Sequence, residues 1–119
     1  MPYFCCIMET IINKVYQAFN IRDVEEVLSF FHPSVDWPNG WEGGYMHGRD
    51  AVRDYWLRQW KELDPTVKPV SFRQLPDGKW QVGVHQLVKN LKGDVISDSV
   101  IKHTYTFDMN LIKKMEIGS

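Results

Sequence analysis

The periodicity of the chain changes at about Val67, and this change limits the possible folds more than any other feature. Before Val67, apolar residues recur at helical spacing, and after it they alternate every second residue, as in strands. Two turn signals, Pro76-Asp77-Gly78 and Leu91-Lys92-Gly93, divide the second part, and a third-position glycine suits a three-residue hairpin loop. The pattern therefore predicts an antiparallel meander with strands over 67–75, 79–90, 94–107 and 111–117.

The first half of the chain predicts three helices and one short strand. An apolar stripe runs toward Asn20, which can end a helix, and it consists of Met8, Ile11, Ile12, Val15, Tyr16 and Phe19. Asp23 followed by Glu26 has the pattern of a helix cap, and a third helix is expected from about Arg49 to Leu63. Between these helices, 34–37 predicts a strand, followed by a glycine-rich loop to about Gly48. A chain of 119 residues has the length of one domain, so we expect residues 1–119 to form a single α+β domain.

The composition excludes several classes of protein. With 44% hydrophobic and 24% charged residues, the chain has ordinary globular composition. A net charge of −1 without a basic cluster argues against a nucleic-acid partner, and the apolar segment 3–8 is too short to span a membrane. Cys5 and Cys6 are adjacent and cannot join distant parts of the fold, so we expect free thiols and a cytoplasmic location. The four histidines lack the spacing of zinc ligands, so no metal site is expected.

The register of the hairpins decides which side chains share a face. If both loops have three residues, odd-numbered residues share one face across three strands, and this face carries His85, His103, Tyr105 and Arg73. The even face is apolar, with Val70, Phe72, Trp80, Val82, Val84, Val88 and Val100. The mixed odd face fits a pocket, and the even face fits a packed core or a dimer interface. A second loop of two or four residues would instead put His85 on the face opposite His103.

The order of elements resembles the nuclear transport factor 2-like superfamily, in its SnoaL-like branch. The resemblance is carried by three strings, which are Ala18-Phe19-Asn20-Ile21-Arg22-Asp23, Val35-Asp36-Trp37-Pro38 and His47-Gly48-Arg49-Asp50-Ala51-Val52. It implies a cystatin-like α+β roll: a conical barrel in which three helices pack on a strongly curved, mixed, mainly antiparallel sheet. It also implies a hydrophobic cavity and a homodimer formed through the outer sheet face, and it favours the odd positions as the pocket-facing ones.

The superfamily includes ketosteroid isomerase, scytalone dehydratase and polyketide cyclases, together with members that only bind. The resemblance places the general base of ketosteroid isomerase at Trp37 of this chain. The isomerase's tyrosine on the first helix would correspond to Val15, next to Tyr16, and the carboxylic acid that helps bind the enolate would lie near His103. Because tryptophan cannot replace the carboxylate base, we do not expect an isomerase of that kind. Asp36 is adjacent, but alternation along a strand points it to the other face.

The candidate catalytic residues are His103 and His85, because imidazole exchanges protons near neutral pH. The alternative is that each is a strand histidine hydrogen-bonded for packing. Arg73 would hold an anionic group or be a solvated arginine at a strand end. The candidate ligand-binding aromatics, which would line a slot or belong to the core, are Tyr16, Trp37, Trp56, Trp60 and Tyr105.

Two functions are compatible with these residues. The first is a small-molecule-binding enzyme that needs no cofactor and uses general acid/base catalysis, of dehydratase, isomerase or cyclase type, on a small apolar ring compound. The second is a non-catalytic ligand-binding or dimeric assembly domain. Trp37 at the base position favours the second, whereas His85, His103 and Tyr105 on one face favour the first.

Overall fold

The computed structural model describes residues 2–118, with side chains from Ile7 onward. The chain forms, in order, α1 (Pro2–Asn20), α2 (Val24–Ser29), β1 (Phe31–Pro38), β2 (Tyr45–His47), α3 (Arg49–Gln59), β3 (Leu63–Gln74), β4 (Trp80–Asn90), β5 (Val95–Asp108) and β6 (Leu111–Gly118). The expected free thiols of Cys5 and Cys6 lie outside the described side chains.

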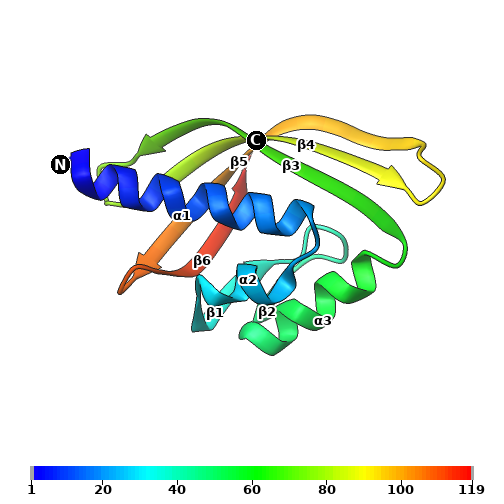
Figure 1. The fold of residues 1–119 in the computed structure, drawn as a ribbon, viewed down its shortest axis with the longest axis horizontal. Helices are drawn as coiled ribbons and strands as arrows, with labels where there is room; N and C mark the ends of the chain where they lie inside the picture. The colour runs from blue at the N-terminus through cyan, green and yellow to red at the C-terminus, as the bar shows by residue number, and fades with distance from the viewer. Residues whose placement is uncertain (1, 119) are drawn as a thin grey trace.

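The six strands form one mixed sheet in the order β2-β1-β6-β5-β4-β3. The pairing of β1 with β6 is parallel, and all other pairings are antiparallel. Figure 1 shows β3 and β4 arching over α1, with α2 and α3 together below α1 in this view. The strongly curved α+β roll expected from the sequence is therefore confirmed.

The helices bury the stripes that their sequences predict. Along α1, Ile12, Val15, Tyr16 and Phe19 are all buried. The Asp23 side chain accepts a hydrogen bond from the backbone N–H of Glu26 (3.3 Å), which caps the start of α2 as expected. On α3 the buried residues are Val52, Tyr55 and Trp56. These side chains form the helical wall of the core.

Both hairpins turn at the predicted glycines, but the strands carry bulges that the sequence did not indicate. Gly78 and Gly93 have φ values of 90° and 93°, the left-handed conformation that glycine adopts without strain. In the second hairpin Lys89 pairs with Val95, but Val88 pairs with Ser97, so Ile96 is an extra residue. A similar shift occurs at Val70, between β3 and β4.

The bulge at Ile96 overturns the prediction that His85 and His103 share a face. Beyond it, His85 pairs with Val100 and His103 pairs with Val82, so even residues of β4 share a face with odd residues of β5. The prediction of one apolar even face is also wrong. Its residues divide between the core, which receives Trp80, Val82 and Val84, and the exposed surface, which receives Val70 and Val100.

Three boundaries also differ from the predicted ones. The loop before Gly48 contains the short strand β2, which pairs with β1. Helix α3 ends at Gln59, and β3 starts at Leu63 rather than near Val67. The new start places Pro65 inside a strand, which is possible because β3 lies at the edge of the sheet.

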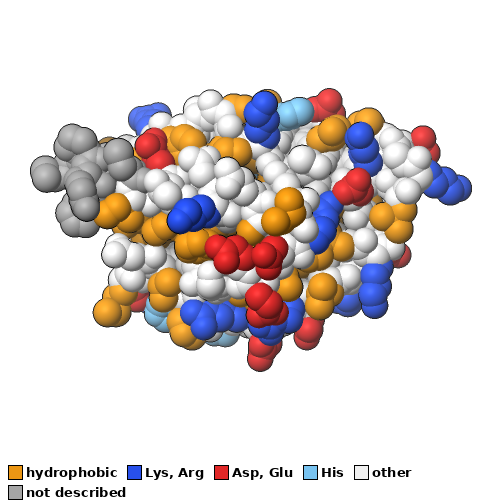
Figure 2. All heavy atoms as spheres, in the orientation of Figure 1, with side chains coloured by type: hydrophobic (Ala, Val, Ile, Leu, Met, Phe, Trp, Pro, Cys, Tyr) orange, Lys and Arg blue, Asp and Glu red, His pale blue; other side chains and the backbone are white. Residues whose placement is uncertain are grey.

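Acidic and basic side chains are interspersed over the face drawn in Figure 2, without a continuous basic patch. This distribution agrees with the net charge of −1. Within residues 2–118, no helix is long and apolar enough to cross a membrane.

Candidate ligand-binding site

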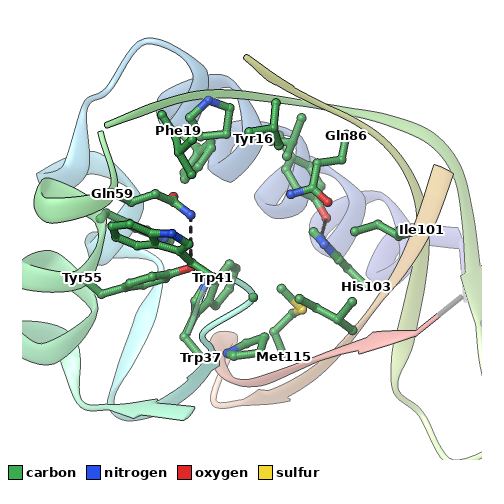
Figure 3. A pocket seen from close by; sticks show the side chains of 18 of the residues that line it. Tyr16, Phe19, Trp37, Trp41, Tyr55, Gln59, Gln86, Ile101, His103 and Met115 are labelled. Atoms are coloured by element: carbon green, nitrogen blue, oxygen red, sulfur yellow. Dashed lines mark hydrogen bonds between the residues drawn. The ribbon is translucent and has the colours of Figure 1, made fainter. Parts of the chain in front are cut away.

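A cavity of about 370 Å³ lies between the helices and the inner face of the sheet, and Figure 3 shows its wall. Exposed lining residues such as Trp41, Ser97 and Ile117 bring the cavity to the molecular surface. Most of the wall is apolar or aromatic, including Val15, Phe19, Trp37, Trp56, Ile101 and Met115. A wall of this kind with a few polar groups is typical of a small-molecule site.

Three buried side chains form a hydrogen-bonded chain at the β5 side of the cavity. The Tyr105 hydroxyl donates to the Tyr16 hydroxyl oxygen (2.7 Å), and the Tyr16 hydroxyl lies 2.8 Å from Nδ1 of His103. The Tyr16 and His103 rings are also stacked, with centroids 5.9 Å apart. Tyr16 and His103 line the cavity, whereas Tyr105 lies behind them and is completely buried.

The direction of this chain follows from the burial of Tyr105. Among the described residues its hydroxyl has one partner, Tyr16, so its hydrogen remains satisfied only if Tyr105 is the donor. The Tyr16 hydrogen then points to Nδ1 of His103, and the imidazole proton is on Nε2. Among the described residues, Trp60 Nε1 is the side-chain nitrogen or oxygen that is fully buried and has no hydrogen-bond partner. Nε2 of His103 also has no protein partner, so it must be accessible rather than fully buried. His103 therefore presents an N–H donor at the cavity.

Tyr16, Tyr105 and His103 are all uncharged at neutral pH. Burial lowers the pKa of His103 to about 4, and burial raises the pKa of both Tyr16 and Tyr105 above the usual range of tyrosine. None of the residues that line the cavity is Asp, Glu, Lys or Arg. The site therefore combines hydrogen-bonding capacity with an uncharged wall.

The α3 side of the cavity has its own polar pair. Nε2 of Gln59 donates to the Tyr55 hydroxyl oxygen (3.2 Å), and both side chains line the cavity (Figure 3). Burial raises the pKa of Tyr55, so its hydroxyl keeps its proton. Polar groups therefore occur at two opposite sides of an otherwise apolar space.

Trp37 and Trp56 form an aromatic floor without filling the cavity. Trp37 stacks on Phe31, with ring centroids 4.9 Å apart, and meets the Trp56 ring edge-on at 5.5 Å. The family resemblance places the carboxylate base of ketosteroid isomerase at Trp37, and in this structure Trp37 is an aromatic part of the cavity wall. The carboxylate of Asp36 lies on the other face of β1, where it pairs with His47 (2.7 Å), as alternation predicted.

Three of the expected site residues lie away from the cavity. His85 is on the outer face and contacts Asp98 (2.6 Å), because the bulge at Ile96 changes the pairing. Arg73 is exposed on the edge strand β3. Trp60 packs behind the wall, stacked on Trp56 with ring centroids 6.0 Å apart. Of the remaining candidates, Tyr16, Trp37, Trp56 and His103 lie in the wall, and Tyr105 reaches it through Tyr16.

The sequence reasoning did not select Tyr55, Gln59, Gln86 and Ser97, which supply polar groups to the cavity. Tyr55 and Gln59 are four residues apart on α3, and this spacing places them on one helix face. That signal was present in the sequence. Gln86 and Ser97 depend on the position of the bulge, so no local pattern reveals them.

Among the described residues, no group of three or more His, Cys, Asp and Glu side chains is arranged to hold a metal ion.

A curved, mixed sheet wrapped around α1 is the architecture expected of the nuclear transport factor 2-like superfamily. The chain belongs to the SnoaL-like domain family of that superfamily, because the profile of the family matches residues 12–86. This membership confirms the resemblance inferred from the sequence. The comparison with curated proteins gave no match.

Several solved structures share the fold. A nuclear transport factor 2-like protein of unknown function from Burkholderia pseudomallei is 20% identical, with a TM-score of 0.81 over 93% of this chain and 88% of its own. TerC, co-crystallised with polyporic acid, is 23% identical, with a TM-score of 0.81 over 93% and 89% of the two chains. A Mycobacterium tuberculosis protein in complex with estradiol-17β-hemisuccinate is 14% identical, with a TM-score of 0.80 over 93% and 92%.

Proposed function

We propose that the protein binds a small, flat, largely apolar ring compound in this cavity. The observation that carries the proposal is an aromatic-walled space of about 370 Å³ whose polar groups are few and placed at its sides. Aromatic walls offer large contact areas with fixed geometry, which suits planar ligands.

Two proteins of the same fold support this ligand class. TerC was crystallised with polyporic acid, and the Mycobacterium tuberculosis protein with an estradiol ester. Both compounds contain flat or nearly flat ring systems.

A thermal-shift panel of steroid-like, polyketide-like and terpenoid compounds tests the proposal, since a ligand that binds only the folded state raises stability by mass action. Two residues provide matched variants. Ile101→Trp would fill the cavity, whereas Leu91→Trp adds the same side chain at an exposed hairpin turn. Shifts with the wild type and with Leu91→Trp, but not with Ile101→Trp, are expected. No shift across the whole panel, or shifts that survive Ile101→Trp, would contradict binding in this cavity.

Acid/base catalysis by His103 is a second candidate, favoured by its 2.8 Å contact with Tyr16 inside the cavity. In such a reaction the Nε2–H group of His103 would act as the general acid. The low pKa of about 4 and the absence of a lining carboxylate make His103 a weak base, so binding is the better-supported function. If a ligand from the panel is converted, His103→Gln should lower kcat by roughly a hundredfold or more. An unchanged kcat would remove His103 from the chemistry.

We also propose a homodimer formed through the outer face of the sheet. Val70, Val95 and Val100 are more than half exposed there, which is unfavourable in a monomer. Light scattering at micromolar concentration should give twice the 14.0 kDa mass of one chain, and Val100→Glu should reduce it. A single 14.0 kDa species in the wild type would refute the dimer.

A further inference from the structure

The cavity presents a hydrogen-bond donor from each of two opposite sides. In Figure 3, His103 and Gln86 extend from the sheet, while Tyr55 and Gln59 extend from α3 across the open space. The donor on the sheet side is Nε2–H of His103, because Nδ1 accepts the Tyr16 hydroxyl.

The donor on the α3 side is the Tyr55 hydroxyl. Its oxygen accepts from Gln59 Nε2 (3.2 Å), and backbone hydrogen bonds from Gly40 and Trp41 also reach it and act to lower its pKa, as N–H donors do. Because donors surround the oxygen, the hydroxyl hydrogen itself has no acceptor among the described residues. Tyr55 is itself buried, so an unused hydroxyl hydrogen costs free energy until a partner arrives. A ligand acceptor in the cavity would be that partner.

We propose that the natural ligand is an uncharged ring compound with a hydrogen-bond acceptor of carbonyl type at each end, as in a dione or a quinone. This inference rests on the proposed function and specifies its ligand class. The indole N–H groups of Trp37, Trp41 and Trp56 are further donors in the wall, and they also favour ligand acceptors. Gln59, Gln86 and Ser97 can each donate or accept, so these three adapt to the ligand rather than select it.

The uncharged wall of the cavity should also disfavour charged ligands. A carboxylate or ammonium group in the cavity would lose its hydration without meeting an opposite charge, because no lining residue is Asp, Glu, Lys or Arg. The proposed ligand is therefore neutral as well as rich in acceptors.

The test compares steroid probes that differ only at their ends. Androstanedione has a ketone at each end, and androstanone has one ketone. We expect androstanedione to bind roughly three- to tenfold more tightly, the effect of one net hydrogen bond. Androsterone sulfate and androsterone acetate have similar length and differ in charge, and the acetate should bind at least about tenfold more tightly. Quenching of tryptophan fluorescence measures all four affinities, and anthraquinone with anthracene repeats the ketone comparison on a shorter frame.

Variants of Tyr55 and His103 test which donor accounts for each difference in affinity. Tyr55→Phe should remove the advantage of androstanedione over androstanone, whereas Tyr45→Phe, at an exposed tyrosine of β2, should keep it. His103→Leu should weaken binding of the dione roughly three- to tenfold, and His103→Gln, which keeps an N–H donor, should restore part of the affinity.

The outcomes separate this inference from the proposed function. If the probes bind but one and two ketones bind equally, or if the sulfate binds as well as the acetate, the ligand class is wrong and ring-compound binding stands. Equal effects of Tyr55→Phe and Tyr45→Phe would also overturn the inference. If no probe on either frame binds, both the inference and the proposed function fail.

Discussion

Tyr16→Phe should destabilise the protein more than any other loss of one hydroxyl in the site. The substitution removes the central member of the chain that links Tyr105, Tyr16 and His103 through contacts of 2.7 and 2.8 Å. It leaves the Tyr105 hydroxyl, at 0% exposure, without an acceptor, and Nδ1 of His103, at 5% exposure, without a donor. Each stranded buried group costs about 1–3 kcal/mol, so the two groups together should cost about 2–6 kcal/mol.

Tyr105→Phe is the matched comparison, because it removes the terminal hydroxyl and strands no hydrogen. The Tyr16 oxygen then lacks one donor but still donates to His103, so a loss of about 1 kcal/mol is expected. The double variant should be no less stable than Tyr16→Phe alone, because Tyr105→Phe also removes the stranded hydroxyl. The two effects are therefore strongly non-additive.

Urea unfolding followed by fluorescence, with unchanged m-values, measures all three variants. Equal losses for the two single variants, or losses that add in the double variant, would refute the direction assigned to the hydrogen-bond chain.

Three further predictions concern single residues. Burial lowers the pKa of His103 to about 4 in the folded protein. As the pH falls, His103 is therefore protonated in the unfolded chain before it is protonated in the folded one. Stability should be full above about pH 6.5 and fall by about 3 kcal/mol as the pH drops toward 4, a loss that urea titrations should find absent in His103→Gln. His85→Ala should change stability by less than about 0.5 kcal/mol and leave probe affinity unchanged, because its pair with Asp98 is exposed; weakened probe binding in fluorescence titrations would contradict its outward position. Asn20→Ala should cost about 1–3 kcal/mol in urea unfolding, because the amide bonds both the N–H and the C=O of Val67 (2.9 and 2.7 Å), whereas Asn13→Ala on the same helix should have little effect.

The parts of the fold that depend on neighbouring residues could be predicted from the sequence. The stripe that buries Ile12 and Phe19, the cap at Asp23, and the glycine turns at Gly78 and Gly93 are all determined within a few residues. Each has a local physical cause, such as helical periodicity or a positive φ, so a pattern reveals it.

The parts that depend on pairing between strands could not be predicted. The extra residue Ile96 has no partner on β4, and nothing in its own side chain marks it as the bulge. The contact between Tyr16 and His103 joins residues 87 positions apart, and no local pattern pairs them. The alternation along β5 and the family resemblance together indicated that His103 faces the cavity. The sequence therefore identified His103 as a candidate but gave the wrong partner, His85 instead of Tyr16.

The extra residue at Ile96 reverses the alternation of side chains along β5. Each residue after the bulge lies on the face of the sheet opposite to the one it would occupy in a regular strand. A strand of the same length that paired without the bulge would place Val88 opposite Ile96, and it would then send Val100 inward and His103 to the surface. The site thus depends on the bulge at Ile96 as much as on the identity of the histidine.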